Sequence, residues 1–257
     1  MYSMPEALHL IRRASILLLL FASAGVIGCA TAPALSPDRE AAIERMDAAE
    51  VDRRIDFITE RLDDTRTHAN LWWYGWTSFY SGAIAYQAVT LAEVDETVRN
   101  PDGRRADLAS SIIRAAGGLT QFLVRPYEAM EGADPIRDLP QSNLQEKRAQ
   151  LVAAESLLAR NARRAKRRLT WYRHVIIAAV NLISSSVVAF GYDDLQRGLI
   201  SLGIGMAIAE GMVLTEPWQP VSDQEDYHRL DGGAPPESPV TWMLTPVPGG
   251  GGLTVRF

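Results

Sequence analysis

Two apolar segments decide the fold: VIIAAVNLISSSVVAFG (residues 175–191) and GLISLGIGMAIAEGMVL (residues 198–214). Only the six residues YDDLQR separate them. Because helices joined by so short a link turn back on each other, the pair predicts an antiparallel helical hairpin. At 1.5 Å per residue, 17 residues reach about 26 Å, a little less than the ~30 Å hydrocarbon core of a typical bilayer. The bacterial outer membrane is thinner than average, which accommodates this length.

Small residues recur every four positions in the second segment, at Gly203, Ala207 and Gly211. A neighbouring stripe has the same spacing: Ser201, Gly205 and Ala209. Such spacing lets helix backbones approach closely in membranes, although soluble helices also cross at small residues. The segment resembles the glycine-zipper hairpins of some outer-membrane lipoproteins, which have longer glycine runs. The resemblance implies helix packing and self-association through the first stripe.

Glu210 is the one acid inside these two apolar segments. In a bilayer, a carboxylate at this depth is a candidate functional acid, because it needs a partner or a path to water. The alternative is structural, since a side chain one turn before the helix end can point outwards.

A third apolar segment, LWWYGWTSFYSGAIAYQAVTLA (residues 71–92), carries no charged side chain. Its aromatic residues crowd one end, as they do where a membrane helix meets the interface. It predicts either a membrane-spanning helix or the buried core helix of a soluble domain. Around it, helical periodicity at 38–64, 106–124 and about 142–173 predicts one helical domain over residues 38–216.

A basic run precedes the hairpin. It contains seven cations and no acid: Arg160, Arg163, Arg164, Lys166, Arg167, Arg168 and Arg173. The run has three interpretations. It lies on an anionic membrane surface, it faces the acidic first helix of the domain, or it is cytoplasmic under the positive-inside rule.

The N-terminus has the pattern of an export signal. Arg12 and Arg13 precede the uncharged stretch ASILLLLFASAGVI (residues 14–27), and Gly28 precedes the single cysteine, Cys29. The residues VIGC (26–29) resemble the lipobox of bacterial lipoproteins, although leucine is commoner than valine at its first position. The resemblance implies that residues 1–28 are a cleaved signal peptide and that Cys29 carries covalent acyl chains such as palmitate. Residues 29–37 would then be a tether.

The last part of the chain, residues 217–257, reads as a Pro/Gly-rich tail. Apolar residues alternate on both sides of the glycine run in VTWMLTPVPGGGGLTVRF (residues 240–257). This alternation predicts a β-hairpin.

Sequence motifs of catalysis are missing. His68, His174 and His228 have no metal-ligand spacing, and we expect no metal and no cofactor beyond the lipid. A cluster of acidic residues and a histidine lies near the C-terminal tail: Asp223, Glu225, Asp226 and His228. It could bind a cation, and the simpler interpretation is that it lies in a solvated loop. With 26 basic and 31 acidic residues, the chain gives no reason to propose nucleic acid as a partner.

These features predict an all-α helical bundle with an apolar helical hairpin and a short C-terminal β-hairpin. We expect a non-enzymatic, lipid-anchored protein of the bacterial cell envelope, on the outer membrane facing the periplasm rather than on the inner membrane. Its expected partners are membrane lipid and a second copy or another envelope protein. The alternatives are a periplasmic lipoprotein module that recruits a partner, and a polytopic inner-membrane protein.

Overall fold

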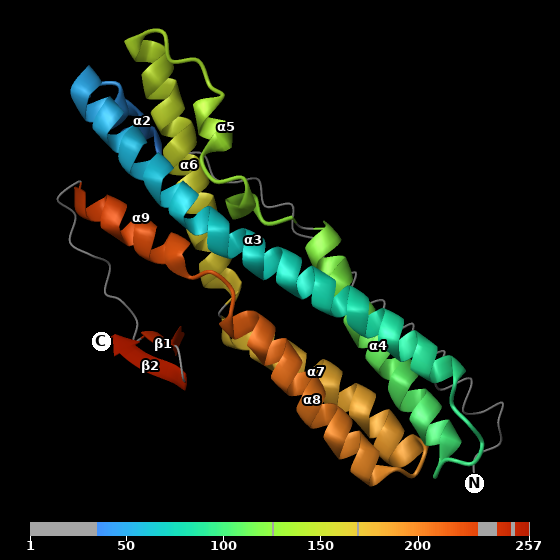
Figure 1. Ribbon diagram of the computed structural model, residues 1–257. Coiled ribbons are helices and arrows are strands. Elements are labelled where there is room, and N and C mark those ends of the chain that lie inside the picture. The colour runs from blue at the N-terminus through green and yellow to red at the C-terminus, as the bar shows by residue number, and fades with distance from the viewer. Residues whose placement is uncertain (1–34, 125, 169, 231–240, 248–249, 257) are drawn as a thin grey trace. The chain divides into compact units, whose positions relative to one another are not determined.

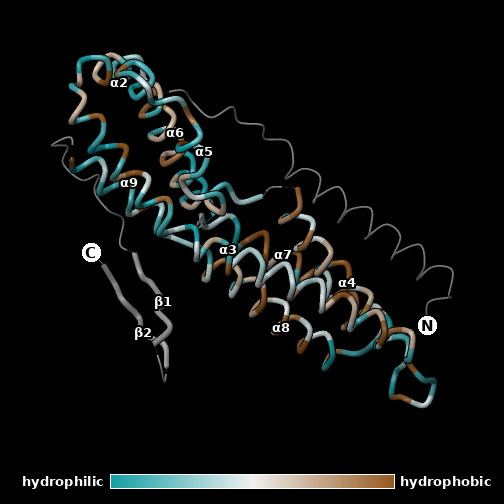
Figure 2. Tube along the Cα trace, turned by 45° about the horizontal axis from the view of Figure 1, so that its top comes forward, coloured by the Kyte–Doolittle hydropathy of each residue, from teal (hydrophilic) through white to brown (hydrophobic). Residues whose placement is uncertain are grey.

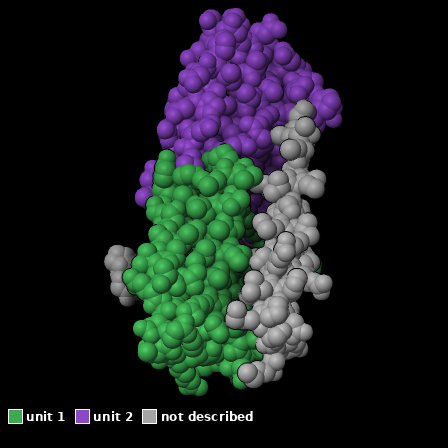
Figure 3. Space-filling model, turned by 90° about the vertical axis from the view of Figure 1, so that its right-hand side faces the viewer, with its two compact units in different colours: residues 1–33, 73–127, 170–212 green, residues 34–72, 128–169, 213–257 purple. Residues whose placement is uncertain are grey.

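The computed structural model describes residues 35–124, 126–168, 170–230, 241–247 and 250–256. This part of the chain is mostly helical, which confirms the coarse prediction of an α-helical fold (Figure 1). Two compact units divide it (Figure 3). Unit 1 comprises residues 1–33, 73–127 and 170–212, and unit 2 comprises residues 34–72, 128–169 and 213–257.

Unit 2 is built from short and long helices. They are α2 (Pro37–Ile43), residues 48–72 of α3 (Ala48–Ala92), the 3-10 turn η1 (Glu128–Met130), α5 (Asp134–Arg137), α6 (Leu144–Arg168) and α9 (Gln219–Leu230). Ser36 caps α2, since its hydroxyl accepts from the Arg39 N–H at 3.3 Å, and Pro37 occupies the first turn. Asp47 likewise accepts from the Glu50 N–H at 2.8 Å, so α3 begins as a new helix.

The apolar side chains of unit 2 form a buried core. Its fully or almost fully buried members come from α2, α3, α5, α6 and α9, and include Ile43, Val51, Ile58, Ile136, Leu151, Leu158 and Tyr227. All residues of this core cluster belong to unit 2. Apolar inside and charged outside, unit 2 has the pattern of a helical domain in water.

Unit 1 contains the predicted apolar helices. They are residues 73–92 of α3, α4 (Pro101–Val124), α7 (Trp171–Ser186), the π-helical turn η2 (Val187–Gly191) and α8 (Leu195–Leu214), whose last residues belong to unit 2. The backbones of α8 and the α7–η2 segment come close, because a Cβ on Gly198 would lie 2.6 Å from that of Ala189. Apolar residues gather along α4, α7 and α8 (Figure 2).

The structure differs from the sequence prediction at three places. The charged helix expected over residues 38–64 and the aromatic segment are joined in one helix, α3, and α4 begins at Pro101, five residues before the expected start at residue 106. Asn100 caps that start by accepting from the Gly103 N–H at 3.0 Å, which places Pro101 in a first turn that tolerates proline. The third difference is α9, which forms within the predicted tail because Val221 and Tyr227 are buried in unit 2.

The C-terminal segment carries strands β1 (Thr241–Val247) and β2 (Gly250–Arg256), which pair antiparallel with Thr241 opposite Arg256 (Figure 1).

Candidate functional site

The surface of unit 1 exposes many large hydrophobic side chains. Of the large hydrophobic side chains that the structure describes as exposed, all but Leu71, Leu214 and Leu230 belong to unit 1. The most exposed of them include Phe190 at 78% and Trp171 at 75%. Two stretches are long and apolar enough to cross a membrane, Trp171–Gly191 and Leu195–Leu230, with only 28% and 22% of their most apolar windows buried. Core helices of a soluble protein would be mostly buried, so this surface is a candidate site for lipid or another protein.

Several polar side chains lie inside unit 1, together with buried apolar residues. The guanidinium of Arg114 on α4 donates from Nη2 to Ser111 Oγ and Ser201 Oγ, both at 2.8 Å. Its Nη1 donates to Asn181 Oδ1 on α7 at 3.3 Å. Asn181 and Ser201 are buried. These polar groups are hydrogen-bonded to one another and lie in the same unit as buried apolar residues such as Phe122 and Val188.

The candidate acid Glu210 has a partner in the structure. Its Oε2 lies 2.6 Å from Nδ1 of His174 on α7, and both side chains are about two-thirds buried. Neighbouring Arg173 donates to Gln121 Oε1 on α4 at 3.3 Å. This end of unit 1 therefore joins α4, α7 and α8 through polar contacts, and Glu210 does not simply point outwards.

The two stripes of small residues on α8 have different surroundings. Gly203 and Ala207 are exposed, and a Cβ on Gly203 would meet nothing within 4 Å. Gly211 is partly covered, and its Cβ would lie 3.8 Å from the ring of Trp76. The other stripe faces inward: Ser201 is buried, and a Cβ on Gly205 would lie only 2.1 Å from Asn181 Oδ1. Within unit 1, the second stripe makes the close approach.

Three cations of the basic run, Arg160, Lys166 and Arg168, form ion pairs in the structure. Arg160 pairs with Glu128 at 3.0 Å, and Lys166 lies 3.7 Å from Glu225. Arg168 is the most buried, with its Nε 3.3 Å from Glu216 Oε1 and its guanidinium 5.7 Å from the centre of the Trp72 ring. All these partners belong to unit 2. For these three cations the structure shows pairing with acids of the same chain. Those acids, Glu128, Glu216 and Glu225, do not belong to the acidic first helix that the sequence suggested.

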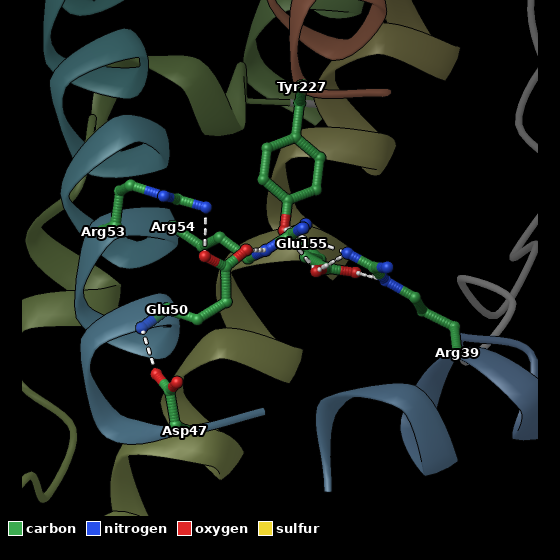
Figure 4. A network of polar contacts seen from close by, with 7 residues as sticks. All are labelled: Arg39, Asp47, Glu50, Arg53, Arg54, Glu155 and Tyr227. Atoms are coloured by element: carbon green, nitrogen blue, oxygen red, sulfur yellow. Dashed lines mark hydrogen bonds and ion pairs between the residues drawn. The ribbon is translucent and has the colours of Figure 1, made fainter. Parts of the chain in front are cut away.

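A polar network crosses the interior of unit 2 (Figure 4). The Tyr227 hydroxyl on α9 donates to Glu155 on α6 and accepts from Arg39 and Arg54 at 3.2 and 3.3 Å. Arg39 donates to both carboxylate oxygens of Glu155 at 2.8 and 2.6 Å. Burial, together with the Glu155 carboxylate, raises the pKa of Tyr227. The network joins α2, α3, α6 and α9 and is structural.

The acidic cluster on α9 does not converge on one point. Asp223 is buried and accepts from Thr65 Oγ1 at 3.3 Å, whereas Glu225 faces Lys166. Asp226 pairs with Arg229 at 2.6 Å, and His228 contacts Gln224 at 3.2 Å. Among the residues that the structure describes, no group of three His, Cys, Asp or Glu side chains is placed to hold a metal ion.

His68 contacts the Thr215 carbonyl at 3.2 Å within unit 2. Cys29 and the VIGC stretch lie outside the described residues. The sequence analysis missed Arg114, Asn181 and the pairing of His174 with Glu210. The sequence did contain a sign that Arg114 faces inward. Asp107, Ser111 and Arg114 are spaced at i, i+4 and i+7 and so lie on one polar face of a helix.

Comparison with protein-family models, curated proteins and solved structures found no match to this chain.

Proposed function

We propose that this chain is a non-enzymatic, lipid-anchored protein of the bacterial cell envelope that self-associates through its membrane-embedded part. In this proposal unit 1 is a four-helix bundle in the membrane, and unit 2 is a helical domain in water. The observation that carries it is a difference between the surfaces of the two units: the exposed large apolar side chains belong almost entirely to unit 1.

The energetic argument concerns the uncovered surface. Transferring a large apolar side chain out of water is favourable by about 1.5–3 kcal/mol. Unit 1 exposes many such side chains on four helices, among them Tyr86, Leu123, Ile183, Leu199 and Ile204. Soluble monomers rarely leave a contiguous apolar surface of this extent uncovered. Lipid covers it in our proposal.

Helix length and polarity agree with this assignment. The 21 residues of Trp171–Gly191 extend about 31 Å, enough for a hydrocarbon core of about 30 Å. Trp76 and Trp171 lie where α3 and α7 enter unit 1, as in an interfacial aromatic belt. The charged and amide groups of Arg114, Asn181 and Glu210 have hydrogen-bond partners inside, as lipid requires.

Membrane extraction tests the embedding. A Cys29→Ser variant, exported by a signal that is cleaved without lipidation, removes the expected lipid anchor and leaves the helices intact. We expect it to stay in the membrane pellet after washing at high pH and high salt. Release into the wash would contradict the proposal and would indicate that a protein partner covers unit 1, as in a periplasmic recruiting module.

Because Cys29 is the only cysteine, the same variant is a background for single-cysteine labelling. We expect Ile183→Cys and Leu199→Cys, both about half exposed, to resist water-soluble maleimides and to react with a lipid-phase reagent. Glu60→Cys, at an exposed position of α3 in unit 2, is the matched control and should react from water. Labelling Arg163→Cys from one side of sealed inner membranes would identify the polytopic inner-membrane alternative.

Self-association is assigned to the exposed stripe of α8. Gly203 and Ala207 have open surroundings, so a second copy can bring its backbone close to them. We expect Gly203→Leu with Ala207→Leu to abolish energy transfer between differently labelled copies in liposomes. Gly75→Leu, at another open glycine of unit 1, is the control and should leave the transfer unchanged. Equal loss in both variants would contradict this interface.

A further inference from the structure

The chain enters and leaves unit 2 at the C-terminal end of α6. After residue 34 it passes between the units four times, after residues 72, 127, 169 and 212. Arg168 marks the first and last of these crossings, because its guanidinium lies 5.7 Å from the Trp72 ring centre and its Nε lies 3.3 Å from Glu216 Oε1. Arg160 marks the second, with its Nε 3.0 Å from Glu128 Oε2. The third crossing follows Arg168 directly in the chain.

This end of unit 2 is also its basic end. Residues 160–168 contain six cations and no acid, whereas residues 38–53, which form α2 and the start of α3, contain six acids and three arginines. Within unit 2, α6 runs parallel to α3, because Lys147 near its start pairs with Asp52 and Arg168 at its end lies on Trp72. Unit 2 is therefore acidic where α2 and α3 begin and basic where the chain crosses.

The cations at this end lie on an exposed side of α6. Lys166 is 53% exposed, Arg167 is exposed and Arg163 is half-buried. Their spacing places them on one side of the helix, opposite the buried residues Ala162 and Ala165. The helix dipole favours cations in the last turn, where Lys166 and Arg167 lie, but Arg163 lies a turn earlier. The dipole thus accounts for only part of this cationic side.

In the proposed function, unit 1 is embedded, so the crossings mark the level of the membrane surface. Trp171 begins α7 only three residues after Arg168 and is exposed, as aromatic side chains are at an interface. Guanidinium groups bind phosphate oxygens through paired hydrogen bonds, and cations next to a membrane helix attract anionic lipid. We infer that Arg163, Lys166 and Arg167 bind the headgroup of an anionic phospholipid. The inference rests on the proposed function for the level of the membrane.

Lipid selectivity tests this surface. The full-length protein is reconstituted in mixed liposomes of phosphatidylcholine and phosphatidylglycerol, one of which carries brominated acyl chains that quench nearby tryptophans. Trp72, Trp73, Trp76 and Trp171 lie close in sequence to the crossings and report on lipid there. Each cation at such a surface contributes about a fivefold preference, so we expect phosphatidylglycerol to bind at least about tenfold more strongly. The preference should vanish in about 1 M sodium chloride, which screens exposed charges.

Arg163→Gln with Lys166→Gln and Arg167→Gln should bring the two lipids close to equal affinity. The three side chains lie opposite the core, so the variant should fold, and its unfolding midpoint in detergent checks this. Arg163→Lys with Arg167→Lys keeps the charge and should retain most of the preference.

The matched control removes three exposed arginines at the acidic end: Arg45→Gln with Arg53→Gln and Arg229→Gln. Arg45 and Arg53 lie on either side of the start of α3. Arg229 follows Tyr227, whose hydroxyl accepts from Arg39 of α2 at 3.2 Å. The net charge changes as in the test variant, and we expect the wild-type preference to remain.

Equal quenching by the two lipids in the wild type would overturn the inference and would favour an acidic protein partner for this surface. The same preference in the wild type and in the triple Arg163, Lys166 and Arg167 variant would also overturn it. Failure of the proposed function gives a different result. If the Cys29→Ser protein washes off membranes but still binds phosphatidylglycerol liposomes in preference to phosphatidylcholine ones at low salt, embedding is contradicted and this surface stands.

Discussion

Asp223 is the buried acid of unit 2 that most directly affects stability. Only 2% of its surface is exposed, its carboxylate accepts from Thr65, and the nearest cation, Arg61, is 3.9 Å away. Burial raises the pKa of Asp223 to about 6, against the attraction of Arg61. The folded state therefore holds this proton more tightly than the unfolded chain, whose aspartate pKa is about 3.9.

We expect unit 2 to lose stability as the pH rises from about 4 through about 6. The contribution of Asp223 is fully present below pH 4 and is lost above pH 6, by about 3 kcal/mol. Asp223→Asn should flatten this part of the profile and raise the unfolding midpoint at neutral pH. Asp52→Asn, which removes the ion pair with Lys147 elsewhere in unit 2, is the control and should leave the slope as in the wild type.

The His174–Glu210 contact is a second residue-scale feature that can be measured. Glu210→Gln keeps the size of the side chain and removes its charge, and we expect a loss of about 1 kcal/mol because a charge-assisted hydrogen bond becomes a neutral one. Glu128→Gln breaks the exposed pair with Arg160 and should cost less than about 0.5 kcal/mol. Equal midpoints for the two variants in detergent would show that the His174 contact adds no stability.

At the scale of the element, two sides of α8 should differ in how well they tolerate a larger side chain. Gly205→Ala should destabilise unit 1 by about 2 kcal/mol or more, because its Cβ displaces the buried Asn181 amide and breaks the contacts of Arg114. Gly203→Ala, two residues earlier in open surroundings, should be neutral or stabilise the helix by up to about 1 kcal/mol. Thermal unfolding of both variants in detergent gives the comparison, and equal effects would contradict the orientation of α8.

The basic end of α6 makes a similar contrast between neighbours. Arg168 and Glu216 are 11% and 4% exposed, so Arg168→Gln breaks a buried ion pair and should cost about 3 kcal/mol. Lys166 is 53% exposed, and Lys166→Gln should cost less than about 1 kcal/mol. Chemical unfolding of unit 2, followed by tryptophan fluorescence, measures both. A small effect at Arg168 would mean that water reaches the Glu216 carboxylate.

For the whole molecule, stability should depend on α9 and not on the segment after it. A chain ending at residue 239 keeps Tyr227 and Asp223, and we expect its unfolding midpoint and membrane retention to equal those of the full chain. A chain ending at Trp218 loses Tyr227 from the core cluster and from the network with Glu155, and should unfold at a clearly lower temperature. If the shorter deletion alone abolishes capture of an envelope protein, the recruiting-module alternative gains support.

The sequence by itself determined the helical class and the two apolar helices of unit 1. The reason is local: long uncharged stretches with a six-residue link leave few structures other than adjacent helices. It also pointed to Glu210 as unusual, since a lone carboxylate among apolar residues needs a partner. It did not locate that partner, because His174 is distant in sequence and lies on a neighbouring helix.

Only the tertiary structure decided which side of each helix faces inward. Two stripes of small residues on α8 look alike in sequence, yet one is open and the other closes over Arg114 and Asn181. In the same way, α9 became a helix because Val221 and Tyr227 find a core to enter, against the propensity of a proline-containing segment. Such outcomes depend on contacts between residues more than sixty positions apart, and helical periodicity describes only near neighbours.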